Sequence, residues 1–186
     1  KVELFIFNGK DTANPRLGIW DITSGGGFSL RHKSTQYFFG GYEMGENEKF
    51  QFPDLNGDGK IDIVAINQNN WTKVHIQSVW DVATISPIRL DRFYGQIDRG
   101  IKWNINRKDR YIFGDWDGDG TDDLAIFNGQ TWTTRYLGLF KSGSLGFLGG
   151  FYKLLDTALP GYTLMPNDVP RRFDKNGDGI DDILFF

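Results

Sequence analysis

The chain has 186 residues, and its 39% hydrophobic and 16% aromatic content together with 24 glycines favours a β-rich fold with many tight turns. It contains no cysteine, which excludes disulfides, thiolate metal sites and cysteine nucleophiles. The formal net charge is −3, and its 21 basic residues form no Lys/Arg run, so we expect no nucleic-acid partner. No apolar stretch reaches about 18 residues, so we expect no membrane insertion.

Strand-like segments recur along the chain. The runs "ELFIFN" (3–8), "DIVAIN" (62–67), "DLAIFN" (123–128) and "DILFF" (182–186) are short, β-branched or aromatic, and bounded by turn residues, as buried strands are. We expect a second strand in "NNWTKVHIQ" and "GQTWTTRYL", a third in "YFFGGY", "RFYGQ" and "FLGGFY", and a fourth in "KFQF", "RYIF" and "PRRF". No segment combines helical caps with 3.6-residue periodicity, so we predict an all-β protein.

A nine-residue acidic pattern precedes three of these strands, as "DLNGDGKID" (54–62), "DWDGDGTDD" (115–123) and "DKNGDGIDD" (174–182). The spacing of nearly 60 residues predicts a repeat architecture, with repeats at 2–61, 62–122 and 123–182 and a final strand at 182–186. We treat 1–186 as one repeat region. Four short strands in about 60 residues is the content of one β-propeller blade, here built of four antiparallel strands.

The acidic loops have the chemistry of calcium sites. Calcium takes about 6–8 oxygen ligands, and alternating Asp or Asn at positions 1, 3 and 5 directs every second side chain inward. Glycine at position 6 allows the bend, position 7 offers its carbonyl, and Asp at position 9 closes the site. One ion per loop gives about three. The predicted ligands are Asp54, Asn56, Asp58, Lys60 and Asp62; Asp115, Asp117, Asp119, Thr121 and Asp123; and Asp174, Asn176, Asp178, Ile180 and Asp182.

An EF-hand loop is the obvious alternative, but it needs a carboxylate at position 12. That position holds Ala65, Ile126 and Phe185, and no helix follows. The loops also hold 12 of the chain's 24 acids, so the rest of the chain carries 12 acids against 21 bases. The acidity is therefore local.

The pattern D-x-[DN]-x-D-G-x-x-D running into a strand resembles the FG-GAP and VCBS repeats, which build the propeller of integrin α subunits and of many secreted bacterial proteins. The stretch "RYIFGDWDGDGTDDLAIFNGQTW" (110–132) is similar to such a repeat almost throughout, whereas the other copies replace the preceding Phe-Gly. The resemblance implies a calcium-binding β-propeller. Three blades are fewer than the four to eight that close a ring, so we expect a segment of a larger ring or a ring completed by another chain.

The leading functional hypothesis is a calcium-stabilised, secreted or cell-surface binding and adhesion module that recognises a glycan or a protein. Trp71 and Trp132 occupy matching positions and could stack on sugar rings in a lectin-like site, although packing between blades is the alternative. Two other functions stay open: a non-catalytic domain of a secreted polysaccharide-active enzyme, and a structural protein whose copies assemble into a filament or surface layer. We expect no catalysis, because His32 and His75 lie in different repeats and no nucleophile motif occurs.

Overall fold

The fold is a series of small antiparallel sheets. The computed structural model describes residues 3–8, 16–33, 38–39, 42–43, 49–59, 61–67, 75–81, 84–85, 88–89, 92–93, 108–128, 137–142, 148–155, 158–159 and 162–186. These residues contain no helix, so none of them forms an apolar helix that could cross a membrane. The predicted all-β class is confirmed.

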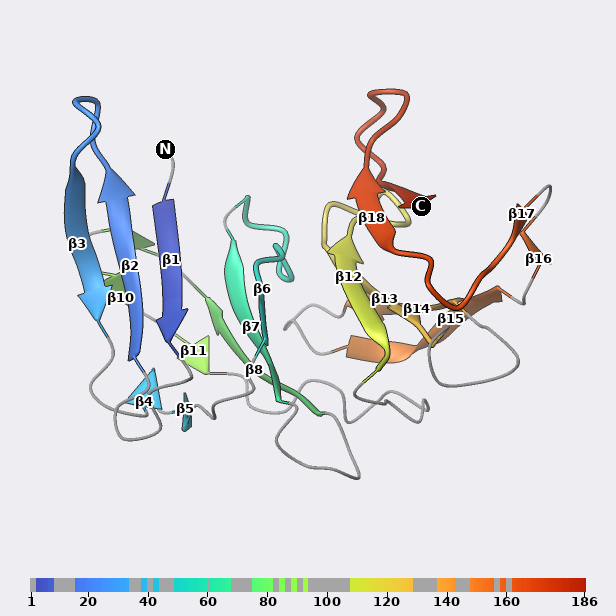
Figure 1. Ribbon diagram of the computed structural model, residues 1–186, viewed down its shortest axis with the longest axis horizontal. Coiled ribbons are helices and arrows are strands. Elements are labelled where there is room, and N and C mark those ends of the chain that lie inside the picture. The colour runs from blue at the N-terminus through green and yellow to red at the C-terminus, as the bar shows by residue number, and fades with distance from the viewer. Residues whose placement is uncertain are drawn as a thin grey trace.

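Four sheets follow one another along the chain and stand side by side (Figure 1). The first has the order β1 (Glu3–Asn8), β2 (Arg16–Ile22), β3 (Phe28–Lys33). The second has the order β11 (Arg92–Phe93), β8 (His75–Asp81), β7 (Asp62–Asn67), β6 (Lys49–Gln51). The third has the order β12 (Arg110–Gly114), β13 (Asp123–Phe127), β14 (Leu137–Ser142), β15 (Leu148–Leu155).

The fourth sheet pairs β18 (Pro170–Phe173) with β19 (Asp182–Phe185). Three short hairpins complete the described strands: β4 (Phe38–Phe39) with β5 (Tyr42–Glu43), β9 (Thr84–Ile85) with β10 (Ile88–Arg89), and β16 (Ala158–Leu159) with β17 (Tyr162–Thr163). Each larger sheet from the second onward begins with the strand that leads into an acidic loop. The sheets are thus offset by one strand from the predicted repeat boundaries.

The strands that flank the acidic loops lie where the sequence pattern predicts them. Of the predicted second strands, the structure describes β8 from His75 and β14 from Leu137, which overlap the ends of the segments 69–77 and 129–137. Residues 69–74 and 129–136 of these segments lie outside the described residues. In the ladder between β7 and β8, Asn67 pairs with His75. The segment "YFFGGY" differs from the prediction, because its two strands pair with each other and not with the first sheet.

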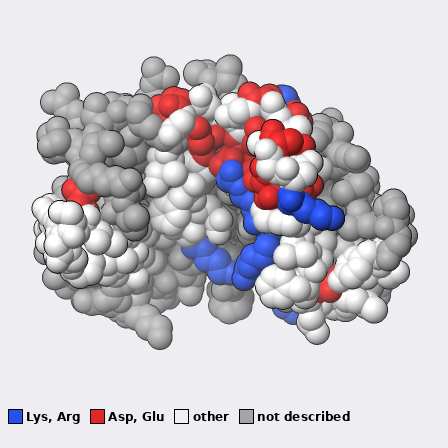
Figure 2. Space-filling model, turned by 90° about the horizontal axis from the view of Figure 1, so that it is seen from above, with Lys and Arg blue, Asp and Glu red and all other residues white. Residues whose placement is uncertain are grey.

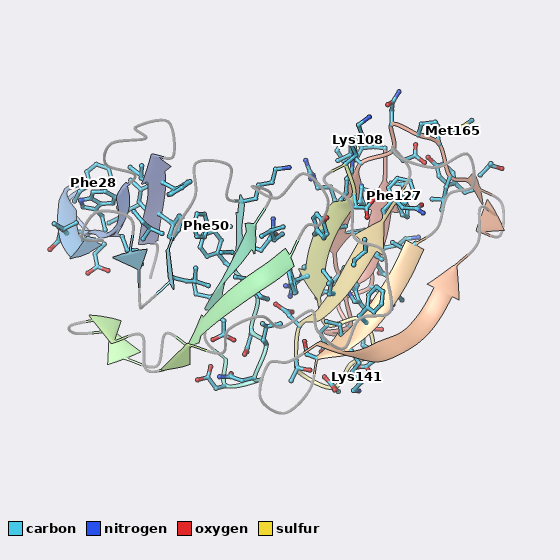
Figure 3. All side chains as sticks on the ribbon, turned by 90° about the horizontal axis from the view of Figure 1, so that it is seen from below. Phe28, Phe50, Lys108, Phe127, Lys141 and Met165 are labelled. Atoms are coloured by element: carbon cyan, nitrogen blue, oxygen red, sulfur yellow. The ribbon has the colours of Figure 1, made fainter. Side chains whose placement is uncertain are left out.

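Successive sheets pack face to face, because their central strands are apolar on both sides. Every residue of β13 is buried, as expected for a strand covered on both faces. Side chains of β2 and β7 form one core cluster, against which Phe5, Phe7 and Phe50 pack. The ring centroids of Phe5 and Phe50 are 5.1 Å apart, and Phe50 lies between the first two sheets (Figure 3). A second cluster joins the third and fourth sheets, with Phe127 of β13 edge-on to Phe185 of β19.

The outer faces of the first and last sheets remain apolar and open. Ile6 of β1 is 46% exposed and Leu184 of β19 is 46% exposed. The equivalent residues of β7 and β13 are buried: Ala65 and Ile126 for Ile6, and Val64 and Ala125 for Leu184. Phe28, at the far side of the first sheet in Figure 3, is also exposed. The described sheets therefore form a stack that ends in apolar faces.

The acidic loops tie the sheets together through a repeated pair of hydrogen bonds. The Asp54 amide donates to Asp122 Oδ2 at 2.9 Å, and the Asp122 amide donates back to the Asp54 carbonyl at 2.7 Å. Asp115 and Asp181 make the same two bonds, at 2.7 and 2.8 Å. Position 1 of one loop is thus joined to position 8 of the next. The two position-8 carboxylates are bridged by Arg172, at 3.0 Å to Asp122 and 2.7 Å to Asp181.

We predict that Arg172→Gln lowers the free energy of unfolding by about 1–2 kcal/mol, since it leaves two largely buried carboxylates without their cation while the half-exposed arginine limits the loss. Arg171→Gln is the matched control: this neighbouring arginine lies over the Phe186 ring, and the variant should lose about 0.5 kcal/mol or less. Urea unfolding of both variants gives the comparison. Equal losses would contradict a special role for the bridge.

Candidate metal centre

All three acidic loops have the same local fold, which is organised by the aspartate at position 1. Asp115 Oδ1 accepts the amides of Gly118 at 2.8 Å and Asp119 at 3.0 Å, and its Oδ2 accepts the amide of Gly120 at 2.9 Å. Asp54 and Asp174 accept the corresponding glycine amides in their own loops. The loop therefore wraps around one carboxylate. The hydrogen bonds to this carboxylate fix the loop backbone, and the backbone sets the directions of the other side chains.

Glycine is required at position 4 because the chain has positive φ there and a neighbouring loop lies close. Gly57 has φ 72° and Gly118 has φ 77°. A Cβ on Gly57 would lie 3.1 Å from Thr121 Cγ2, and one on Gly118 would lie 3.0 Å from Ile180. Position 4 of one loop thus packs against position 7 of the next, alongside the position 1 to position 8 hydrogen bonds. The three loops consequently form one row at the same end of the sheets (Figure 1).

The middle loop brings three carboxylates together. One oxygen from each of Asp115, Asp117 and Asp119 lies within 4.8 Å of the others. Such a group of oxygens has the spacing that a hard divalent cation needs. Asp115 is half-buried, whereas Asp117 and Asp119 are exposed to solvent. An ion could therefore enter from the solvent side while Asp115 anchors the loop from within.

Asp123, at position 9 of the middle loop, supplies an independent sign of a cation site. Its side chain is 0% exposed; Oδ1 accepts the Ser142 amide at 2.7 Å, but Oδ2 has no hydrogen-bond partner. Burial, followed by the charges of Asp117 and Asp119, raises the pKa of Asp123 from 3.8 to about 7. A buried carboxylate oxygen without a donor, beside two further carboxylates, is costly unless a cation or a proton reaches it.

The first and third loops satisfy their position-9 aspartates differently. Asp62 Oδ2 accepts the Leu55 amide at 2.9 Å, and Asp182 Oδ2 accepts the Lys175 amide at 3.0 Å. These loops also carry Asn56 and Asn176 where the middle loop has Asp117, so each places fewer negative charges at positions 1, 3 and 5. Both loops retain oxygen ligands suited to calcium, but they hold less negative charge that a cation would neutralise.

Lys141 partly neutralises the middle loop from a neighbouring strand. Its Nζ lies 2.5 Å from Asp117 Oδ2 and 2.8 Å from Asp119 Oδ2, at the periphery of the molecule (Figure 3). The hydrogen bond from Lys141, and that from Thr121, lower the pKa of Asp119. By strand register, the corresponding positions of the first two sheets hold Asp21 and Asp81. At this position the third sheet therefore has a lysine, whereas the first two sheets have an aspartate.

The structure describes most of the predicted ligands and omits three predicted residues. Lys60, Trp71 and Trp132 lie outside the described residues. Within the middle loop, Thr121 donates from both its amide and its hydroxyl to Asp119 Oδ1, and in the third loop the Ile180 amide donates to Asp178 Oδ1 at 2.8 Å. Sequence reasoning missed Asp122, Asp181, Arg172 and Lys141. The Asp-Asp pair that ends two of the loops could have indicated a second role for one carboxylate.

Comparison of the chain with protein-family models and with curated protein sequences found no match.

The raised pKa of Asp123 predicts that the ion-free protein loses stability as pH rises from about 4 to 7. In this window the folded state binds a proton that the unfolded state has released, so the free energy of unfolding falls with pH. Asp123→Asn keeps an acceptor for Ser142 and has no titratable group, so its stability should fall less over the same range. Urea unfolding in chelator from pH 4 to 8 compares the two. Parallel pH profiles would refute the prediction.

A second prediction concerns Lys141, which a cation bound by the middle loop must displace from Asp117 and Asp119. Lys141→Gln should tighten calcium binding at one site about threefold or more, because the competing ammonium group is gone. Calcium titration calorimetry measures this change. Lys108→Gln removes an exposed lysine that precedes β12 and should alter the affinity less than twofold. Unchanged affinity in Lys141→Gln would rule out competition.

Proposed function

We propose that the protein is a calcium-stabilised, extracellular or cell-surface binding module. The observation that carries the metal assignment is the buried Asp123 Oδ2, which lacks a hydrogen-bond donor beside the triad of Asp115, Asp117 and Asp119. A divalent cation would offset half of the negative charge of these four carboxylates, beside which Lys141 is the cation that the described residues provide. Oxygen-only donors on a short, solvent-accessible loop suit calcium, and its millimolar extracellular concentration suits a site with exposed ligands.

The first and third loops have the same backbone conformation as the middle loop and would each bind one calcium ion, which gives about three ions in total. Their position-1 aspartates hold the loop in the shape of the middle loop, and positions 3 and 5 carry an amide and a carboxylate. Asn176 Nδ2 donates to Asp178 Oδ2 at 2.8 Å, so these two side chains already lie together. We expect weaker binding here than in the middle loop, because fewer carboxylates need the ion.

We propose further that the sheets are blades of a β-propeller related to the FG-GAP and VCBS repeats. Three features support a repeated, ring-like arrangement: the same bonds join successive loops, the same glycine packs on the next loop, and inner sheets are buried on both faces. The apolar outer faces of β1 and β19 would be covered by further blades or by a second copy of the chain. Such rings display a surface for a glycan or protein ligand and need no catalytic group.

Recognition, not catalysis, is the function that this arrangement supports best. Most aspartates of the described residues lie in the loops and serve loop geometry, inter-loop bonds or the proposed metal sites. Trp71 and Trp132 remain predicted sugar-stacking residues. A non-catalytic domain of a larger secreted enzyme is the same module in another setting.

Calcium should raise the melting temperature of the protein in a saturable way, since an ion that binds only the folded state stabilises it by mass action. Asp123→Asn should remove much of this increase but should not lower the melting temperature in chelator, because it keeps an acceptor for the Ser142 amide and removes a buried carboxylate that is uncompensated without metal. Melting curves with calcium and with chelator test both expectations.

Asp168→Ala is the control for the calcium experiment. Asp168 is also buried, but it accepts the Met165 amide far from the loops, so its loss should lower the melting temperature equally with and without calcium. Identical melting curves of the parent protein in calcium and chelator would refute structural calcium.

A further inference from the structure

A groove lies where the lead-in strands of the second, third and fourth sheets converge. Two adjoining pockets of about 370 and 380 Å³ share five lining residues: Gln51, Tyr111, Ile112, Pro170 and Arg171. These volumes fall within the range of about 300–1,000 Å³ that small-molecule sites occupy. β6, β12 and β18 each contribute lining residues, so the groove exists only because the three sheets stand side by side. Seen from above, it corresponds to the hollow between the sheets in Figure 2.

The described residues give the groove positive charge without carboxylate partners. Lys49, Arg110 and Arg171 line the same pocket, one from each sheet, and none of the described residues that line it is Asp or Glu. Among the described residues, no carboxylate forms an ion pair with Lys49 or Arg171. Arg110 directs one guanidinium nitrogen to the Asp168 carbonyl at 2.6 Å, which orients the side chain without neutralising it. Lys and Arg side chains surround the hollow in Figure 2.

The neighbouring arginine shows what a compensated cation looks like in this fold. Arg172 lines the adjoining pocket, but it forms ion pairs with Asp122 and Asp181. Three converging cations without carboxylates repel one another and favour an anion between them. A guanidinium offers paired donors that match a carboxylate or a sulfate group, and an ammonium adds a point charge.

The remainder of the lining is suited to a sugar ring. Tyr111 and Phe52 offer aromatic surface, the latter 40% exposed, and the largely buried Pro53 and Pro170 complete the apolar lining. Gln51 belongs to both pockets and can donate to and accept from hydroxyl groups. Aromatic faces beside a few polar groups are what a pyranose ring contacts, with its C–H side on the aromatic ring.

We propose that this groove binds an acidic saccharide, with the carboxylate or sulfate group held between Lys49, Arg110 and Arg171 and a sugar ring lying against Tyr111. This inference rests on the proposed binding function and specifies the ligand class of that function. The site is separate from the calcium loops: calcium holds the sheets in place, and the convergence of the sheets forms the groove.

The test uses calorimetric titration of the calcium-loaded chain at the same calcium concentration in both solutions. The probes are trigalacturonate, its fully methyl-esterified form, a sulfated disaccharide and sodium sulfate. Trigalacturonate or the sulfated disaccharide should bind, and the affinity should fall as salt is raised from about 50 to 200 mM. The methyl ester keeps the sugar rings and removes the charge, so it should bind at least about tenfold more weakly than the acid.

Exposed groove residues provide the variants, since their replacement should leave the fold intact. Lys49→Gln and Arg171→Gln should each weaken binding roughly fivefold, and Arg171→Lys should recover part of the loss. Lys108→Gln removes a cation that does not line the groove and should change affinity less than twofold. Unchanged calcium stabilisation in each variant confirms that the metal loops are intact.

Each outcome has a distinct meaning. The proposal is overturned if the parent protein binds the methyl ester as tightly as the acid. It is also overturned if the two groove variants bind the acidic saccharide as tightly as the parent protein does. Sulfate that binds as tightly as either saccharide leaves a general anion site and overturns the saccharide assignment. If calcium stabilises the protein and the protein binds only neutral glycans on an array, the acidic-saccharide assignment of the groove is refuted while the proposed function stands. If calcium has no effect on melting, the proposed function fails independently.

Discussion

The structure depends on how each acidic loop compensates its own carboxylates. The aspartate at position 1 does so with backbone amides alone: in the third loop, the bond from Gly179 followed by those from other loop amides lowers the pKa of Asp174. Because these amides belong to positions 4 to 6 of the loop, satisfying one carboxylate also fixes the loop backbone. The loop then presents position 8 to its neighbour and position 9 to the following strand.

Position 8 shows how the same residue type can serve a different purpose directly beside a proposed metal ligand: Asp122 precedes Asp123 in the sequence. Burial raises the pKa of Asp122, and the bond from the Asp54 amide and the charge of Arg172 oppose this effect. The Asp122 carboxylate thus accepts a hydrogen bond from the Asp54 amide of another sheet. This bond connects two loops that are far apart in sequence. Position 8 of the first loop is Ile61, which is exposed and cannot make this connection. The row of inter-loop hydrogen bonds therefore begins at the first loop, through Asp54 alone.

Local pattern predicted the strands beside the loops, the positions of the loop glycines and the crowding of carboxylates. These features follow from residues within about nine positions of one another, where turn chemistry and alternation are informative. The register of β8 against β7 and of β14 against β13 could not be predicted in the same way, because it depends on pairing between segments that a loop separates. Lys141 was likewise missed: it lies 22 residues after Asp119, and only the register of β14 against β13 brings it to the loop.

The groove could not be foreseen for a similar reason, since Lys49, Arg110 and Arg171 are isolated in the sequence and meet only when three lead-in strands converge. Its charge is nevertheless linked to the loops. Within the described residues, the repeated motif gathers most acids at one end of each sheet and engages them in loop and inter-loop contacts. Few are left to pair with cations elsewhere, and a chain with a small net charge therefore has a cationic hollow beside an acidic row (Figure 2). Calcium on the acidic row would reduce the negative charge of that row, so the nearby carboxylates would repel an anionic ligand in the hollow less strongly.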